Sequence, residues 1–181
     1  QVTLVADPLL DVPRSLMEWV DKKLSAVAPT DVAEVTISRG EAAPLTLSKG
    51  EAGSLTVAEI PKGKVMDSAK AGNLDNLLNA LEAADIADKT VTDETTGLDQ
   101  PMLVTVKTRR NQLYALRVGK EAEGGRRFVR LEAGMMPAPA EPAADADEAT
   151  KTAAKEAQVA YDAAALEVGE FNQRVSGWTY L

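Results

Sequence analysis

The chain has 181 residues, a formal net charge of −8, and neither cysteine nor histidine. The two missing residue types exclude Cys–His and Ser–His–Asp nucleophile systems and the ordinary structural zinc sites. The acidic balance argues against general nucleic-acid binding, which needs a positive surface.

The N-terminal region predicts a short strand followed by an amphipathic helix. Residues 1–6 read as the strand, which Pro8 ends. Residues 13–24 place their apolar side chains, Trp19 among them, on one helical face. We find neither a signal peptide nor a run of about 20 apolar residues that could span a membrane. Because the chain starts at Gln1 without a methionine and stops in a strand-like run, we expect both ends to be cut.

The stretch from residue 32 to residue 81 predicts a strand pair, a third strand at 55–57 and a helix. Val35 and Ile37 alternate with polar residues, and so do Leu45 and Leu47, so the pair has one apolar face. The helix, from about residue 67 to 84, carries four leucines with the spacing of one buried face: Leu74, Leu77, Leu78 and Leu81. We expect this stripe to pack on the apolar sheet face.

A second meander follows, with strands at 102–108, 113–118 and 127–132. Both faces of its middle strand are partly apolar, which indicates a place inside a sheet. Residues 135–146 contain three prolines among alanines and acids, as a linker or insertion would. Residues 147–175 favour a long helix, and its apolar residues repeat at four and three: Ala157, Tyr161, Ala164, Val168, Phe171 and Val175. Since alanine buries little area, we expect the second half to pack and the first to project.

These elements predict an α+β fold, with antiparallel meander sheets packed against amphipathic helices. Each meander precedes a helix, so the chain could hold two loosely similar units. We divide it into an α+β core at 1–134, with sub-units 1–88 and 98–134. A Pro/Ala-rich linker or insertion occupies 135–146, and residues 147–181 form a long helix and a terminal strand that returns to the core.

Two stretches resemble a known family. Residues 15–24, SLMEWVDKKL, lead into residues 32–37, VAEVTI, and this is similar to the bacterial domain of unknown function DUF4340. Residues 171–180, FNQRVSGWTY, resemble that family's helix-to-strand ending, and the likeness covers most of the chain except 135–160. The resemblance implies an extracytoplasmic domain behind an N-terminal membrane helix, often beside ABC-type transport or gliding-type systems. The family has no established catalytic residues to carry over.

The second meander is the sharpest charge feature. Residues 102–132 hold eight basic and three acidic side chains, a net charge of +5. Arg109, Arg110, Arg126 and Arg127 lie in its two turns and are candidates for anionic lipid headgroups, a polyanionic polymer or an acidic protein. The favoured alternative is a solvated sheet whose arginines discourage edge pairing. The two turns should lie at opposite ends of the sheet, so we expect two separate weak patches screened by salt.

Other candidate sites are weaker. Five acids could hold a hard cation, but the calcium-loop spacing is missing and a solvated loop is favoured: Asp85, Asp88, Asp93, Glu94 and Asp99. The sequence has no Ser-x-x-Lys and no glycine motif for phosphate. Trp19 and Trp178 could line a groove, and core packing is the better expectation for both.

The sequence therefore favours a non-enzymatic, extracytoplasmic interaction or scaffold module of a membrane-associated assembly, accessory to an ABC-type transport system. We expect a protein partner, no cofactor, no metal and no nucleic acid. We expect the protein in the periplasm or cell envelope. Membrane contact would come only through an anchor outside this sequence. The alternative is a hydrolase that depends on carboxylates or on a divalent cation.

Overall fold

The computed structural model describes residues 21–50, 53–57, 60 and 62–181. The predicted strand at 1–6, Trp19 and most of the predicted helix at 13–24 lie outside these residues. For residues 21–24 the prediction of a helix was wrong, because these residues are not helical. There Lys23 forms an antiparallel bridge with Glu82, and the Leu24 N–H donates to the Leu81 carbonyl at 3.0 Å.

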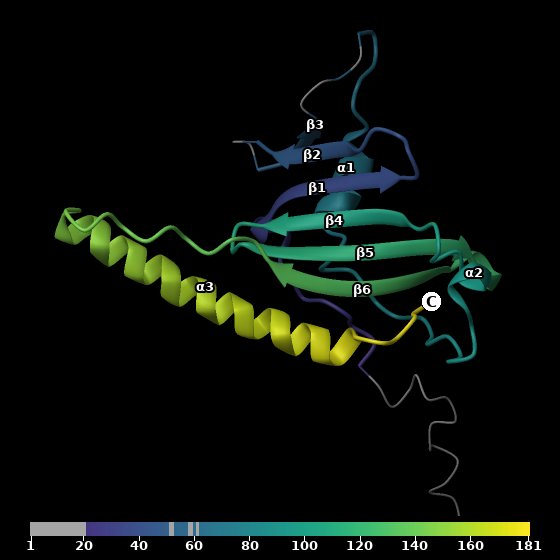
Figure 1. The fold of residues 1–181 in the computed structure, drawn as a ribbon. Helices are drawn as coiled ribbons and strands as arrows, with labels where there is room; N and C mark the ends of the chain where they lie inside the picture. The colour runs from purple at the N-terminus through teal and green to yellow at the C-terminus, as the bar shows by residue number, and fades with distance from the viewer. Residues whose placement is uncertain (1–20, 51–52, 58–59, 61) are drawn as a thin grey trace, which may run out of the picture.

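Both predicted meanders join in a single antiparallel sheet with the order β3-β2-β1-β4-β5-β6 (Figure 1). The first meander supplies β1 (Val32–Arg39), β2 (Leu45–Lys49) and β3 (Leu55–Val57), and the second supplies β4 (Met102–Thr108), β5 (Gln112–Glu121) and β6 (Arg127–Met135). The α+β class is confirmed, and β5 lies inside the sheet as expected. The repeat of two units is not confirmed, because both meanders are halves of one sheet.

Cross-strand neighbours build the core on one face of this sheet. Leu47, Val35, Val106 and Tyr114 are paired in turn across β2, β1, β4 and β5, and all four are buried. Phe171 of the C-terminal helix meets Tyr114 edge-on, with the ring centroids 5.2 Å apart. The period-two pattern of the sequence thus becomes a continuous apolar row.

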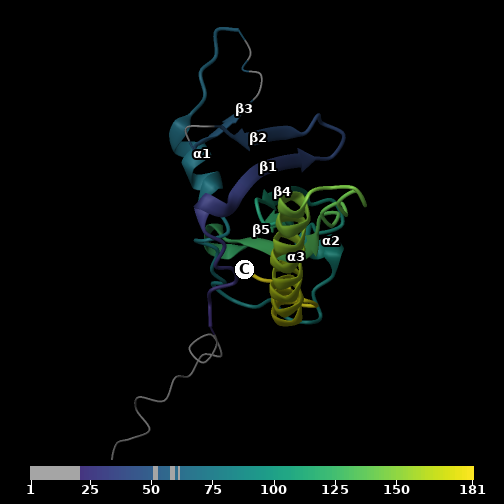
Figure 2. The ribbon, with the colours of Figure 1, turned by 90° about the vertical axis from the view of Figure 1, so that its left-hand side faces the viewer.

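Helix α1 (Ser68–Asp75) covers the β1–β3 half of the sheet, well apart from the C-terminal helix (Figure 2). Asp67 caps it, since its carboxylate accepts hydrogen bonds from the backbone N–H groups of Ala69 and Lys70. Lys49 of β2, with 5% of its side chain exposed, forms a 2.7 Å ion pair with Asp75. This buried pair ties the end of α1 to the sheet.

The helix is shorter than the sequence predicted, because the chain leaves the helix at Asn76 instead of continuing to residue 84. Asparagine favours such an end, and residues 81–83 then bond to residues 22–24. The Ala83 N–H donates to the Lys22 carbonyl at 2.8 Å. Leu78 nevertheless reaches the core with 1% exposure, and the other three leucines of the predicted stripe pack against it partly buried: Leu74, Leu77 and Leu81.

Helix α3 (Glu148–Val175) runs beside β6, and its first half extends past the strands (Figure 1). Its buried residues all lie in the second half: Ala164, Val168, Phe171 and Val175. The expectation that the second half packs while the first projects is confirmed. Residues 136–147 form neither helix nor strand and run back beside α3, where the Tyr161 hydroxyl donates to the Met136 carbonyl at 2.9 Å.

The edge of the sheet at β6 is capped from two sides. The Asn172 side chain accepts from the Ala133 N–H at 2.9 Å and donates to the Ala133 carbonyl at 2.7 Å. Tyr180 exchanges two backbone hydrogen bonds with Val129, each 2.9 Å long. The predicted terminal strand is therefore reduced to isolated bridges at Tyr180. Both contacts fill edge positions that would otherwise be open to another strand.

Truncating Leu78 tests the core. Because its side chain is 1% exposed, Leu78→Ala should lower the free energy of unfolding by about 2–5 kcal/mol in urea titrations. Leu166→Ala is the matched control, since Leu166 is 73% exposed and should change stability by less than about 0.5 kcal/mol. Equal losses in both variants would contradict the assignment of the leucine stripe to the core.

Candidate functional site

The structure separates the four candidate arginines into two places. Arg109 and Arg110 lie in the turn between β4 and β5, and Arg126 and Arg127 lie where β5 passes into β6. These turns are at opposite ends of β5 (Figure 1). The four side chains therefore form no common pocket.

Arg110 is engaged within the fold. Its guanidinium makes a two-pronged pair with the Glu167 carboxylate of α3, with both N–O distances 2.7 Å. Gln112, 2% exposed, donates to the same carboxylate at 3.1 Å and to the Ala164 carbonyl at 3.4 Å. The Arg110 hydrogen bonds are the main reason that the pKa of Glu167 is lowered, and the pKa of Arg110 is raised by the same contact. This cluster fastens the β4–β5 turn to α3, and it was not recognised from the sequence.

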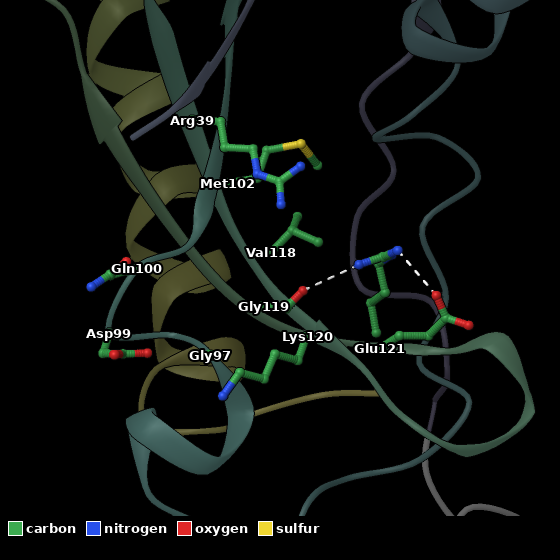
Figure 3. A pocket seen from close by; sticks show the side chains of 10 residues that line it. Arg39, Gly97, Asp99, Gln100, Met102, Val118, Gly119, Lys120 and Glu121 are labelled. Carbon is green, nitrogen blue, oxygen red and sulfur yellow. Dashed lines mark hydrogen bonds and ion pairs between the residues drawn. The ribbon is translucent and has the colours of Figure 1, made fainter. Parts of the chain in front are cut away.

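At the other end of the sheet, Arg127 lines an open pocket of about 680 Å³ (Figure 3). The pocket gathers two further cations, Arg39 from the end of β1 and Lys120 from β5, with the carboxylates Asp99 and Glu121. Arg39, Met102 and Val118 are cross-strand neighbours on β1, β4 and β5, and their side chains lie next to one another along one wall of the pocket. Distant parts of the sequence thus meet here; sequence reasoning had singled out Arg127 as a cation and Asp99 as a possible cation ligand, but not their meeting.

Two of the three cations in this pocket already have partners. Arg127 bonds to the Glu121 carboxylate at 3.1 Å and to the Gly119 carbonyl at 3.5 Å, shown as dashed lines in Figure 3. The Lys120 ammonium donates to the Glu94 carbonyl at 2.9 Å. Arg39 makes no ion pair among the described residues. The pocket can attract a small anion through screened charge, with a single uncommitted guanidinium to hold it.

A tight glycine contact builds the wall of this pocket. A Cβ on Gly119 would lie 2.2 Å from the Thr96 carbonyl oxygen, so only glycine lets β5 approach helix α2 (Asp93–Thr96) so closely. Gly97, at φ 71°, then turns the chain away from α2. The lining side chains include no hydroxyl group. The pocket therefore presents charge and shape without a hydroxyl or thiol nucleophile.

Two acidic residues of the loop at 85–99, Asp88 and Asp93, make contacts within the fold. Asp88 accepts from the N–H and hydroxyl of Thr90, which lowers the pKa of its carboxyl group. Asp93 pairs with Arg130 at 2.6 Å. Over the described part of the chain, no group of three or more acids could hold a metal ion. Nor does any described helix have the length and apolar character to cross a membrane.

Trp178 was expected in the core, and this was wrong. Its side chain is 37% exposed, and the Lys89 ammonium lies 4.9 Å from the ring centroid. Gly177, at φ 79°, turns the chain so that Tyr180 enters the core with 6% exposure. The tryptophan instead lines two open pockets, as the alternative prediction of a groove had it, and offers its face to the Lys89 cation.

Comparison with known proteins assigns the first part of the chain to a protein family. Residues 1–101 match the domain of unknown function DUF4340. The chain belongs to this family. The matched DUF4340 residues end just before β4, so the sequence likeness seen at residues 171–180 lies outside them. No curated protein and no solved structure matches the chain.

The Arg110–Glu167 pair predicts a pH effect on stability. A carboxylate with a lowered pKa stabilises the fold above its ordinary value of 4.5, and this contribution disappears as the pH falls through the folded-state pKa. Both side chains are more than a third exposed, so Glu167→Gln should cost less than about 1 kcal/mol at pH 7. Urea titrations should show the variant and the wild type converging at pH 3. An equally large loss at both pH values, or in the control Glu156→Gln, would contradict this assignment.

Proposed function

We propose that this DUF4340 protein is a non-enzymatic interaction module of a membrane-associated assembly, held outside the cytoplasm by an anchor beyond this sequence. Accessory service to an ABC-type transport system is the setting that the family resemblance favours. The partner is a protein, and no cofactor takes part. The projecting first half of α3 is the observation that carries the proposal.

That half of α3 adds little to the core. All of the buried residues of the helix lie at or after Ala164, and the preceding turns are mostly exposed. Val159 on this half is 62% exposed, and Leu166, on the half that packs, is 73% exposed. The residues of α3 before Ala164, 148–163, span about 24 Å, so the chain maintains an arm that its own sheet does not need. Exposed apolar side chains on such an arm are typical of a contact surface.

The pockets support binding rather than catalysis. The cationic pocket at the end of the sheet offers Arg39 as a secondary contact for an acidic partner, and the pair of Arg127 with Glu121 reduces its net charge. Rim charges of this kind steer an encounter more than they hold a complex. The projecting part of α3 would then supply the apolar contact with the partner. The cationic pocket at the end of the sheet would orient the partner.

Site-specific photo-cross-linking in cells tests the proposal. A photoreactive amino acid at position 159 or 166 should give protein adducts that fractionate with the cell envelope, because these side chains face the proposed partner. Position 70, exposed on α1 and away from both α3 and the cationic pocket, is the matched control and should give none. Adducts that are absent from 159 and 166, or equally strong from 70, would overturn the arm as the contact surface.

The alternative of a cation-dependent or carboxylate-dependent hydrolase makes a separate prediction. A metal ion that binds the folded state must raise the melting temperature. Thermal melts with calcium, magnesium or manganese should show no shift beyond that of a matched sodium salt if the interaction module is right. A saturable shift with one of these ions would favour the hydrolase.

A further inference from the structure

A second polar pocket lies at the opposite end of β5 from the cationic pocket, and is called here the tyrosine pocket, after Tyr114. Its volume is about 550 Å³, and its walls come from the segment before β1, the start of β5 and the second half of α3. The Arg110–Glu167 pair described above forms part of one wall. A pocket of this volume lies in the range of small-ligand sites.

The Tyr114 hydroxyl group has no hydrogen-bond partner in the described part of the chain, although the residue is only 5% exposed. Burial is the main cause that raises the pKa of Tyr114, and no hydrogen bond contributes to that shift. The described residues contain no enclosed side-chain polar atom that lacks a partner, so this hydroxyl group is not sealed in the core and opens into the pocket. Because a buried phenol normally has a partner, the molecule that fills the pocket supplies it.

Ser25 adds a second buried hydroxyl group to the tyrosine pocket. The residue is 3% exposed, and its oxygen accepts a hydrogen bond from the Val27 N–H at 3.5 Å. No acceptor among the described residues takes the proton of this hydroxyl group. Each of the two hydroxyl groups therefore keeps a donor for a ligand.

Five charged side chains line the pocket, two of them cations and three of them carboxylates: Arg110, Arg174, Asp31, Glu167 and Glu170. Their net charge of −1 disfavours a polyanion such as a nucleotide. Arg110 and Glu167 hold each other at 2.7 Å. The other three make no ion pair among the described residues, so the pocket keeps charges of both signs for a ligand.

The geometry of α3 sets the spacing of two of these free charges. Glu170 and Arg174 lie four residues apart, which is one helical turn or about 6 Å along the axis. Arg174 also lies within electrostatic reach of the Tyr114 hydroxyl group, since its charge acts on the pKa of Tyr114. The pocket thus offers a guanidinium group and a hydroxyl donor to an anion, with a carboxylate one turn away for a cation.

We propose that the tyrosine pocket binds a free α-amino acid. Its carboxylate accepts hydrogen bonds from Tyr114 and Arg174, with the Ser25 hydroxyl group as a further donor, and charge-assisted bonds of this kind are strong. Its ammonium group faces Glu170 and Asp31. An α-amino acid carries its two charges close together, as the spacing on α3 requires, and the pocket leaves room for a side chain. This small-ligand site is independent of the contact surface proposed on α3.

Melting curves with each of the common L-amino acids, at about 10 mM, test the site. A ligand that binds the folded state raises the melting temperature, so at least one amino acid should give a saturable rise. The N-acetyl derivative and the amide derivative of that amino acid should each give none, because each lacks one of the two charges. The inference is overturned if no amino acid raises the melting temperature, or if either derivative acts as well as the free amino acid.

Isothermal titration calorimetry of hydroxyl variants then tests the role of Tyr114. Tyr114→Phe removes a hydroxyl group that has no partner in the described fold, so it should weaken binding about tenfold while the melting temperature of the ligand-free protein stays unchanged. Tyr161→Phe is the matched control, since its hydroxyl group bonds to the Met136 carbonyl outside the pocket. It should leave the affinity unaltered. Equal affinities for the wild type and Tyr114→Phe would contradict the proposed contact.

Charge variants complete the design. Arg174→Gln and Glu170→Gln should each weaken binding by about tenfold, because each removes one charge that the ligand pairs with. Arg117→Gln, at an exposed arginine of β5 outside the pocket, should bind like the wild type. A similar loss in Arg117→Gln, or none in the two α3 variants, would overturn the inference. Cross-linking from positions 159 and 166 does not depend on this site, so failure of either proposal leaves the other standing.

Discussion

The antiparallel pairing of β1 with β4 is the contact on which the rest of the structure depends. It joins two meanders that are separated by the 44 residues between Val57 and Met102. Once Val35 meets Val106, the apolar row continues to Tyr114 and on to Phe171 of α3. The helix is thus positioned by an apolar row to which both meanders contribute.

Much of this arrangement could be predicted from local pattern. Period-two alternation located the six described strands, and the four-and-three repeat located α3, because both patterns express one buried face. The same reasoning overextended α1, since Leu77 and Leu81 keep helical spacing although the chain has left the helix. Turns at residues 76–79 keep that spacing, with the Ala80 N–H donating to the Asn76 carbonyl at 3.0 Å. The prediction for Trp178 was wrong because it rested on residue type alone, which does not reveal the turn at Gly177.

The functional surfaces were harder to predict, because they are built by contacts between distant residues. Nothing near Arg110 in the sequence indicates that Glu167 will bind its guanidinium, and nothing near Ala133 indicates that Asn172 will cap its backbone. Arg39 is the last residue of β1 and Arg127 is the first residue of β6. They reach one pocket only because these two strand termini lie at the same end of the sheet. Their meeting depends on strand order, which no local pattern contains.

The capped edge at β6 has a consequence for how sheets of this protein could merge. Tyr180 and Asn172 occupy β6, while in the described part of the chain no strand lies beyond β3. A six-stranded sheet with one open edge strand can pair with another such sheet only once, β3 against β3. The product exposes a blocked β6 at each end, so it cannot elongate. Fibril growth by edge addition is self-limiting as long as the C-terminal residues stay in place.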